Sequence, residues 1–307
     1  MKKESTYPKD IFVHLPDLLR MEGYARGFSF LAKKQKVRSV LGGKHASKLR
    51  GRGMDFEEVR NYVPGDDIRN IDWKVTARTQ VTHSKVFSEE KEKPALIIVD
   101  QSRSMFFGSQ VKTKSVVAAE VAALAAFKIQ KEGDRVGGMV YTEEGIDVVL
   151  PKRNKKNTLL FLERMVYHNH KLAEGKVGER QETLSEAMRK VKNIVTHDYL
   201  VIVISDFKDY SDRVIKYLSG LAQHNDLLLV KVSDPFERDI PKEKMIFGDG
   251  TKQLAIQGHK KQVQQKFQEG FDAGLKDFEA KMLKHRIPVF HVNTVDQVDE
   301  QIKNLFR

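Results

Sequence analysis

From Ala95 onward, the chain alternates between short apolar runs rich in β-branched residues and longer segments with helical spacing. Six runs are predicted to be strands: Ala95–Asp100, Arg135–Tyr141, Ile146–Leu150, Tyr199–Ser205, Asp226–Val232 and Pro288–Asn293. Several are apolar at consecutive positions, as strands buried on both faces are. Helices are predicted at Lys112–Lys131, Asn157–His168, Thr183–Val195, Ser211–His224, Gln262–His285 and Val295–Phe306. This alternation predicts an α/β fold with a mostly parallel central sheet, and Met245–Gly258 is predicted to add a hairpin.

The first part of the chain has a different character. We expect residues 1–94 to form a smaller, basic N-terminal subdomain and residues 95–307 to form the α/β domain. Leu15–Lys34 has the spacing of an amphipathic helix. Between Gly23 and Met54 there is no acidic residue but there are nine Lys and Arg residues. Such a basic block binds phosphates or pairs with the carboxylates just downstream, and the sequence leaves both readings open.

Composition excludes several classes of protein. The chain has no cysteine, so it has no disulfide framework, thiol nucleophile, zinc-thiolate site or iron–sulfur cluster. Its longest apolar stretch, around Val116–Phe127, contains Glu120 and is shorter than a membrane span. No apolar segment follows the basic start, so we expect no secretory signal and a cytoplasmic protein. The net charge of +12 favours an acidic partner, nucleic acid or an anionic surface.

An acid and two hydroxyls follow the first strand of the α/β region. Asp100, Ser102 and Ser104 alternate in the loop at the carboxyl end of that strand, where open parallel sheets bind ligands. Another apolar strand is followed directly by Asp206, and Thr183 opens a predicted helix. Taken singly, Ser102 and Ser104 are also typical of helix caps, and a purely structural interpretation is favoured for Thr183 as a helix cap and for Asp206 as a turn residue. Together, their oxygen atoms suit a hard cation such as Mg²⁺ or Mn²⁺, so we predict a metal site at this edge of the sheet.

The same five residues resemble the metal-ion-dependent adhesion site of von Willebrand factor A domains. The resemblance implies that Ser102 and Ser104 are direct ligands and that Thr183 is a direct or water-mediated one. It also implies that Asp100 and Asp206 are the charge-balancing acids. In that family an open position on the metal accepts a carboxylate from a partner protein.

A second resemblance covers nearly the whole chain. Gly51–Lys74, Ala77–Arg78, Asp100–Met105, Gly133–Gly137 and Ser233–Glu237 are similar to the signature of the bacterial domain-of-unknown-function 58 family, whose members carry a von Willebrand A-like domain. Arg103 stands where the adhesion-site pattern usually has glycine, a variation that this family tolerates. Within the first segment, Trp73 is the only tryptophan of the chain and is expected to anchor that segment.

Members of that family typically accompany MoxR-type AAA+ ATPases and other von Willebrand A proteins. The resemblance therefore implies a Rossmann-like von Willebrand A fold and an adaptor or chaperone-like role beside such an ATPase. With the predicted site, this gives a metal-dependent protein-interaction module that binds an acidic residue of its partner.

Two other classes of function compete with that prediction. An enzyme is disfavoured, because no Gly-x-Ser-x-Gly elbow surrounds Ser102 or Ser104 and no Walker A, Rossmann glycine or zinc motif occurs. The alternative that we keep is a protein that binds nucleic acid or an anionic surface through its basic block. Its binding would weaken steeply with salt and would not need Asp100.

Overall fold

The computed structural model describes residues 7–26, 54–89, 92–174, 183–208, 210–241, 244–248, 253–257 and 260–306. The described residues belong to two compact units, one within residues 1–33 and 93–307 and the other within Lys34–Glu92. Most of the basic block predicted between Gly23 and Met54 lies outside the described residues.

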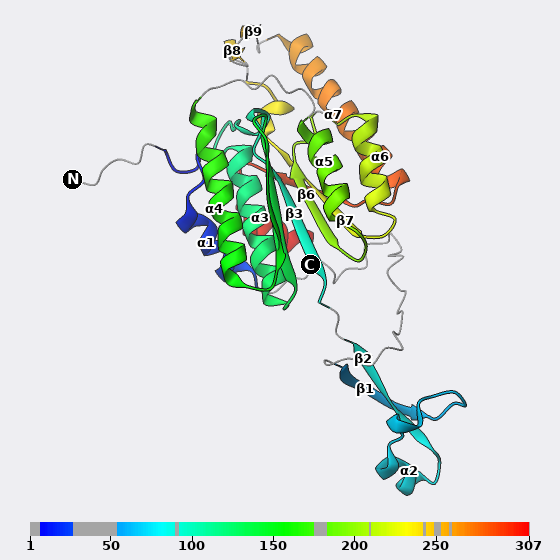
Figure 1. Ribbon diagram of the computed structural model, residues 1–307. Coiled ribbons are helices and arrows are strands. Elements are labelled where there is room, and N and C mark those ends of the chain that lie inside the picture. Colours follow the sequence, from blue (N-terminus) through cyan, green and yellow to red (C-terminus); the bar gives the residue numbers. More distant parts are fainter. Residues whose placement is uncertain are drawn as a thin grey trace, which may run out of the picture. The chain divides into compact units, whose positions relative to one another are not determined.

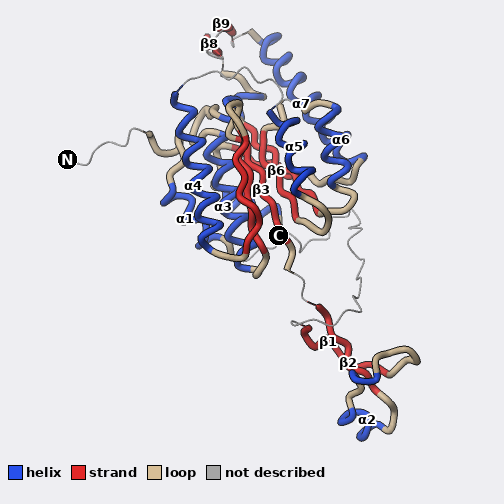
Figure 2. Tube along the Cα trace, viewed as in Figure 1, coloured by secondary structure: helices blue, strands red, loops and turns tan. Residues whose placement is uncertain are grey.

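A six-stranded sheet forms the centre of the larger unit, in the order β10-β7-β6-β3-β4-β5 (Figures 1 and 2). Its strands are β3 (Pro94–Asp100), β4 (Arg135–Tyr141), β5 (Ile146–Lys152), β6 (Leu200–Ser205), β7 (Asp226–Ser233) and β10 (Val289–Asn293). Neighbouring strands are parallel except β4 and β5, which are antiparallel. This confirms the predicted α/β fold with a mostly parallel sheet.

The order of the strands creates a switch point between β3 and β6. The chain runs from β3 through β4 to β5 at one edge, then returns to β6 and continues through β7 to β10 at the other edge. In doubly wound sheets, the crevice at the carboxyl ends of the two strands beside such a switch point is where ligands bind. The parallel register pairs Val99 with Ile204, so Asp100 and Asp206 follow at the same edge of the sheet.

Helices cover both faces of the sheet (Figure 1). On one face lie α1 (Leu15–Tyr24), α3 (Lys114–Lys131), α4 (Lys155–Lys171) and α8 (Val298–Leu305), and on the other lie α5 (Thr183–Ile194), α6 (Asp212–Leu221) and α7 (Lys261–Lys284). Side chains alternate along a strand, so Ile97 and Val99 of β3 pack toward the first set while Leu96 and Ile98 pack toward the second. The consecutive apolar residues of the strands are explained by these two cores.

The N-terminal helix belongs to the α/β unit and not to a separate N-terminal subdomain. α1 packs on α3 and α4, and its Leu18 is buried in the same core as α3. The predicted boundary at residue 94 is therefore wrong for residues 7–26, because amphipathic spacing shows that a helix has an apolar face but not which core buries it. The helix ends at Tyr24, whereas Lys34, its predicted end, lies outside the described residues.

A buried asparagine fastens the segment before α1 to the rest of the unit. Asn169 is fully buried; its Oδ1 accepts a hydrogen bond from the Val13 backbone N–H at 2.7 Å and its Nδ2 donates to Gln101 Oε1 at 2.9 Å. We expect Asn169→Leu to lower the free energy of unfolding by about 2 kcal/mol, because it leaves a buried donor and a buried acceptor unpaired. Urea denaturation followed by circular dichroism measures this. A loss below about 0.5 kcal/mol would contradict it.

The smaller unit is a two-stranded antiparallel sheet with one short helix. It contains β1 (Met54–Asn61), β2 (His83–Glu89) and α2 (Trp73–Thr79), and the Asp72 carboxylate caps α2 by accepting from the backbone N–H groups of Lys74 and Val75. Ser84 is the one buried side chain among those described in this unit. With so small an interior, Trp73 is 69% exposed, so its interpretation as an anchor is wrong.

The predicted hairpin is present as β8 (Lys244–Gly248) paired antiparallel with β9 (Gln253–Gln257), and its turn lies outside the described residues.

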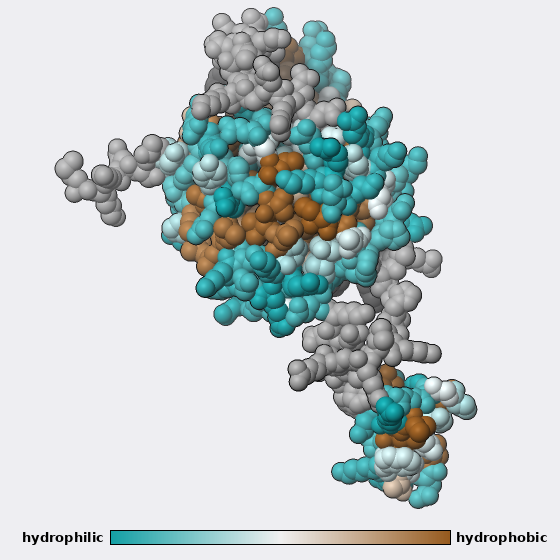
Figure 3. Space-filling model, viewed as in Figure 1, coloured by the Kyte–Doolittle hydropathy of each residue, from teal (hydrophilic) through white to brown (hydrophobic). Residues whose placement is uncertain are grey.

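Figure 3 shows a band of apolar side chains crossing the visible face of the α/β unit. The exposed large apolar side chains of this unit include Leu150 on β5, at 56%, and Leu160 on α4, at 39%. Among the helices that the structure describes, none combines the length and the apolar character needed to cross a bilayer.

Candidate functional site

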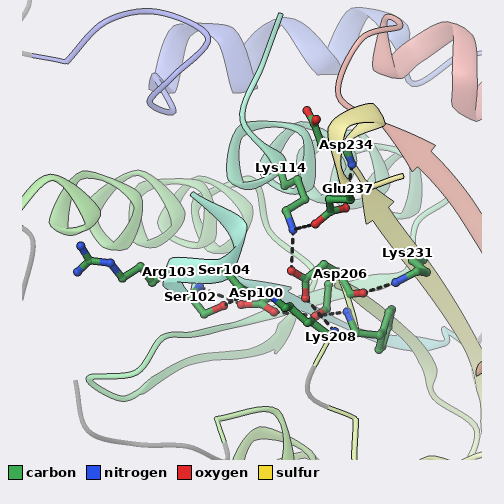
Figure 4. Close-up of polar contacts among 12 residues, drawn as sticks. Asp100, Ser102, Arg103, Ser104, Lys114, Asp206, Lys208, Lys231, Asp234 and Glu237 are labelled. Atoms are coloured by element: carbon green, nitrogen blue, oxygen red, sulfur yellow. Dashed lines mark hydrogen bonds and ion pairs between the residues drawn. The ribbon is translucent and has the colours of Figure 1, made fainter. Parts of the chain in front are cut away.

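Two loops that carry acids and hydroxyls meet at the switch point, beyond the carboxyl ends of β3 and β6 (Figure 4). β3 ends at Asp100, and a short 3-10 turn at Arg103–Met105 folds the next residues back over the strand end. β6 ends at Ser205, so Asp206 is the first residue beyond it. Asp100, Ser102 and Asp206 are each at most 5% exposed, and Ser104 is half-buried.

The Asp100 carboxylate accepts hydrogen bonds on both of its oxygen atoms. Oδ1 accepts from the Ser102 backbone N–H at 2.9 Å, and Oδ2 accepts from the hydroxyls of Tyr141 at 2.8 Å and Ser205 at 2.6 Å. These bonds orient the carboxylate but supply no positive charge. No Lys, Arg or His among the described residues forms an ion pair with it.

The two serines lie together beside the acids. The Oγ atoms of Ser102 and Ser104 are 3.2 Å apart, and the Ser104 hydroxyl also contacts the Asp206 carboxylate. Arg103, between them, directs its side chain away from the carboxylates in Figure 4, while its backbone N–H donates to Glu143 Oε1 at 2.7 Å. The structure thus brings together Asp100, Ser102, Ser104 and Asp206 of the predicted set.

Thr183 is the predicted residue that the structure does not join to the others. It is the first residue of α5, is half-buried, and follows residues 175–182, which lie outside the described part of the chain. Within what is described, no hydrogen bond links its side chain to the other four residues.

A lysine that the sequence pattern did not single out reaches the same place. Lys114, at the start of α3, is 1% exposed, and its Nζ lies 2.8 Å from Asp206 Oδ2 and 2.6 Å from Glu237 Oε1 (Figure 4). Asp206 also accepts from the Lys208 backbone N–H through Oδ1, and its backbone carbonyl accepts from Lys231 Nζ. The two carboxylates that pair with Lys114 are 92 and 123 residues away in sequence, so no local sequence motif predicts this cluster.

Glu237 is held in position by its own loop. After β7, Asp234 and Glu237 form a capping box around the short turn Pro235–Glu237, in which Glu237 Oε2 accepts from the Asp234 backbone N–H at 3.0 Å. Asp234 is 1% exposed, and its Oδ2 accepts from the Thr294 hydroxyl at 2.6 Å and the Ser109 backbone N–H at 2.9 Å. The segment Ser233–Glu237 therefore supplies a rigid second carboxylate for Lys114.

The two central aspartates differ in their electrostatic state. Burial, reinforced by the negative charge of Asp206, raises the pKa of Asp100 to about 6. Burial also acts to raise the pKa of Asp206, but the ammonium of Lys114 outweighs it and holds the pKa below its usual value. For Lys114, burial lowers the pKa, yet the charges of Asp206 and Glu237 leave it above the ordinary value. The charge of Asp206 is thus balanced by the ammonium of Lys114, whereas the carboxylate of Asp100 has no such counter-charge among the described residues.

A doubly wound sheet with a cluster of carboxylates and hydroxyls at its switch point defines this protein as an α/β domain with a candidate ligand site at that edge of the sheet. Its chain belongs to the family described as Protein of unknown function DUF58, whose model matches residues 58–276. The predicted family membership is confirmed by this match.

Relatives of similar sequence come from mycobacteria. The uncharacterized protein Rv1480 of Mycobacterium tuberculosis and the uncharacterized protein Mb1516 of Mycobacterium bovis are each 28% identical over 211 residues, which cover 69% of this chain and 65% of theirs. The chain therefore matches somewhat less than two thirds of the length of these relatives.

Among solved structures, the conserved hypothetical protein BatB from Bacteroides thetaiotaomicron has a TM-score of 0.45 and 14% identity, covering 69% of this chain and 96% of its own. An aerotolerance-related membrane protein from Bacteroides fragilis has a TM-score of 0.42 and 14% identity, covering 70% and 96%. The SpRpn10 VWA domain has a TM-score of 0.40 and 9% identity, covering 69% and 94%.

Proposed function

We propose that this protein is a protein-interaction module that binds a divalent cation, Mg²⁺ or Mn²⁺, at the switch point of its sheet through Asp100, Ser102, Ser104 and Asp206. The observation that carries the proposal is the state of Asp100. A carboxylate that is fully buried beside a second carboxylate and has no basic partner among the described residues is costly, and a cation relieves that cost.

The side chains present are suited to such an ion. Carboxylate and hydroxyl oxygens are the ligands that hard cations prefer. The described residues hold no group of three or more His, Cys, Asp or Glu side chains arranged for a metal, so the serine hydroxyls are needed to complete a ligand set. The cluster contains four carboxylates, Asp100, Asp206, Asp234 and Glu237, against two ammonium groups, Lys114 and Lys231. The charge of a divalent ion balances the difference.

The partner that we propose is a protein that presents an acidic residue. When bound, the ion would offer a coordination position to that carboxylate, and Thr183 is proposed as a further ligand, direct or through water. From the family resemblance, a MoxR-type AAA+ ATPase and other von Willebrand A proteins are the proposed partners, in an adaptor or chaperone-like role. Equal retention of such an ATPase with and without Mg²⁺ would contradict metal-dependent binding.

Thermal melting in Mn²⁺ tests the cation site. We compare the native protein with the double variant Ser102→Ala/Ser104→Ala, which removes two proposed ligands without changing a buried charge. If the dissociation constant is about 1 mM, about 10 mM Mn²⁺ stabilises the native protein by about 1.4 kcal/mol and raises its melting temperature by about 2–4 °C. The double variant is expected to show no rise.

A matched control is Ser219→Ala on α6, whose hydroxyl bonds the Lys216 carbonyl in the same helix. It is expected to respond to Mn²⁺ as the native protein does. A rise of equal size in the double variant would place the cation elsewhere, and no rise in the native protein at that concentration would count against the proposed site.

A further inference from the structure

Lys114 occupies the position from which a cation at the proposed site would be repelled. Its ammonium group is 2.8 Å from Asp206 Oδ2, one of the oxygen atoms proposed to hold the ion. The side chain is 2% exposed, so solvent does not screen it as it would screen a surface lysine. A metal ion bound to the same Asp206 carboxylate would lie close to the Lys114 ammonium, and two positive charges that close together in the protein interior repel each other strongly.

The position of Lys114 is built into the fold and does not depend on a flexible surface contact. The residue begins α3 directly after Thr113, whose hydroxyl accepts from the Val116 backbone N–H as the helix cap and donates to the Ile11 carbonyl. At its other end, Lys114 is shared between Asp206 and Glu237, and the capping box with Asp234 fixes Glu237. The ammonium is therefore held at Asp206 from two sides.

We infer that Lys114 is an internal counter-cation that competes with the divalent ion for Asp206 and sets how tightly the proposed site binds metal. This inference rests on the proposed function and adds its regulation. In the absence of metal, the Lys114 ammonium neutralises Asp206. Metal binding requires Asp206 to exchange that ammonium for the ion, with Glu237 left to hold the lysine. The native protein is thereby tuned to bind metal weakly, and removing the lysine charge tightens binding.

Titration with Mn²⁺, in which electron paramagnetic resonance counts the unbound ion, measures the affinity directly. We expect Lys114→Met to bind Mn²⁺ at least about tenfold more tightly than the native protein, because a repulsive charge is removed and Asp206 is freed. Lys114→Arg keeps the positive charge and is expected to stay within about twofold of the native affinity.

Lys112→Met is the matched control. Lys112 also carries a largely buried ammonium, but it pairs with Glu120 at 2.8 Å instead of Asp206. Lys112 lies two positions from Lys114, so Lys112→Met removes one charge from the same segment. This variant is expected to bind Mn²⁺ with an affinity within about twofold of the native protein. A tenfold gain in this control would mean that overall charge, and not competition at Asp206, sets the affinity.

Lys114→Met leaves two acids without their counter-charge, which threatens folding. Lys114→Met/Glu237→Gln removes the lysine together with its second acid, still frees Asp206, and is expected to show the same tightening. Equal affinity in the native protein and in both lysine-free variants, or weaker binding in the variants, would overturn the inference while leaving the metal site in place. Failure of every variant and of the native protein to bind Mn²⁺ would overturn the proposed function itself.

Discussion

Replacing Gly138 by alanine is expected to destabilise the α/β unit by about 3 kcal/mol, although it adds a single methyl group. Gly138 lies in the middle of β4, and a Cβ atom there would meet the ring of Phe161 on α4 at 2.0 to 2.4 Å. Phe161 is 1% exposed and packed within the core, so its ring has no free space to move into. The strand or the helix would have to shift.

Two further variants show whether this contact is the cause. Gly145→Ala, in the turn between β4 and β5, adds the same methyl group where nothing lies within 4 Å, and is expected to change stability by less than about 0.5 kcal/mol. Gly138→Ala/Phe161→Leu should lose less than the sum of its two single variants, because the smaller side chain makes room. Strict additivity in urea denaturation would contradict the proposed clash.

The glycine before Gly138, Gly137, is the last residue of the family-like segment Gly133–Gly137 and is also required by packing. A Cβ on Gly137 would come within 2.6 Å of the Val149 carbonyl oxygen on β5, the strand paired with β4. Gly137 thus leaves room for the backbone of β5, and Gly138 leaves room for Phe161 of α4. The sequence showed a glycine-containing strand, but not that its glycines were required by packing.

The α/β layers could be predicted because the sequence of each central strand indicates that both of its faces are buried. In β3 and β6, consecutive apolar residues serve two separate cores, and this pattern is visible without knowledge of the partners. The position of α1 could not be predicted in this way. Its apolar stripe fits any core. The helix is placed by its contacts with α3, and the segment before it is placed by the bond from Val13 to Asn169, 156 residues away.

The candidate site was also predictable only in part. Asp100, Ser102, Ser104 and Asp206 were found because they follow strands whose carboxyl ends meet at one edge. Lys114 was missed, because a lysine at the start of an apolar helix is ordinarily solvated. Its burial results from Asp206 and Glu237, which the fold brings to it from two other loops.

Asp100→Asn is expected to stabilise the metal-free protein at pH 7, by about 2 kcal/mol. The pKa of Asp100 is about 6 in the folded protein, against an ordinary value of 3.8, mainly because burial disfavours its charge. Keeping the carboxylate ionised therefore costs up to about 3 kcal/mol of folding free energy above pH 6. Asparagine keeps an oxygen for the Ser102 N–H and removes that cost, at the expense of rearranging the hydroxyls of Tyr141 and Ser205.

The pH dependence gives the sign of this effect. Because the folded-state pKa is raised, the folded protein binds the proton more tightly than the unfolded chain does. The stability from this group is present below about pH 4 and is lost as the pH rises toward 6. Tyr141, the other titratable group bonded to Asp100, has a raised pKa and stays protonated throughout this range. As the pH rises from 4 to 7 in the presence of EDTA, the free energy of unfolding of the native protein should decrease relative to that of Asp100→Asn.

Asp206→Asn is the matched control, since it changes the neighbouring carboxylate in the same way but should act in the opposite direction. The pKa of Asp206 is held low by Lys114 despite burial, so its charge stabilises the fold, and removing it leaves the lysine with Glu237 alone. If both variants lose stability at pH 7, the charge of Asp100 is not a burden on the fold. If Asp100→Asn gains stability but no longer responds to Mn²⁺, the buried acid is retained at a cost in stability because the site needs it.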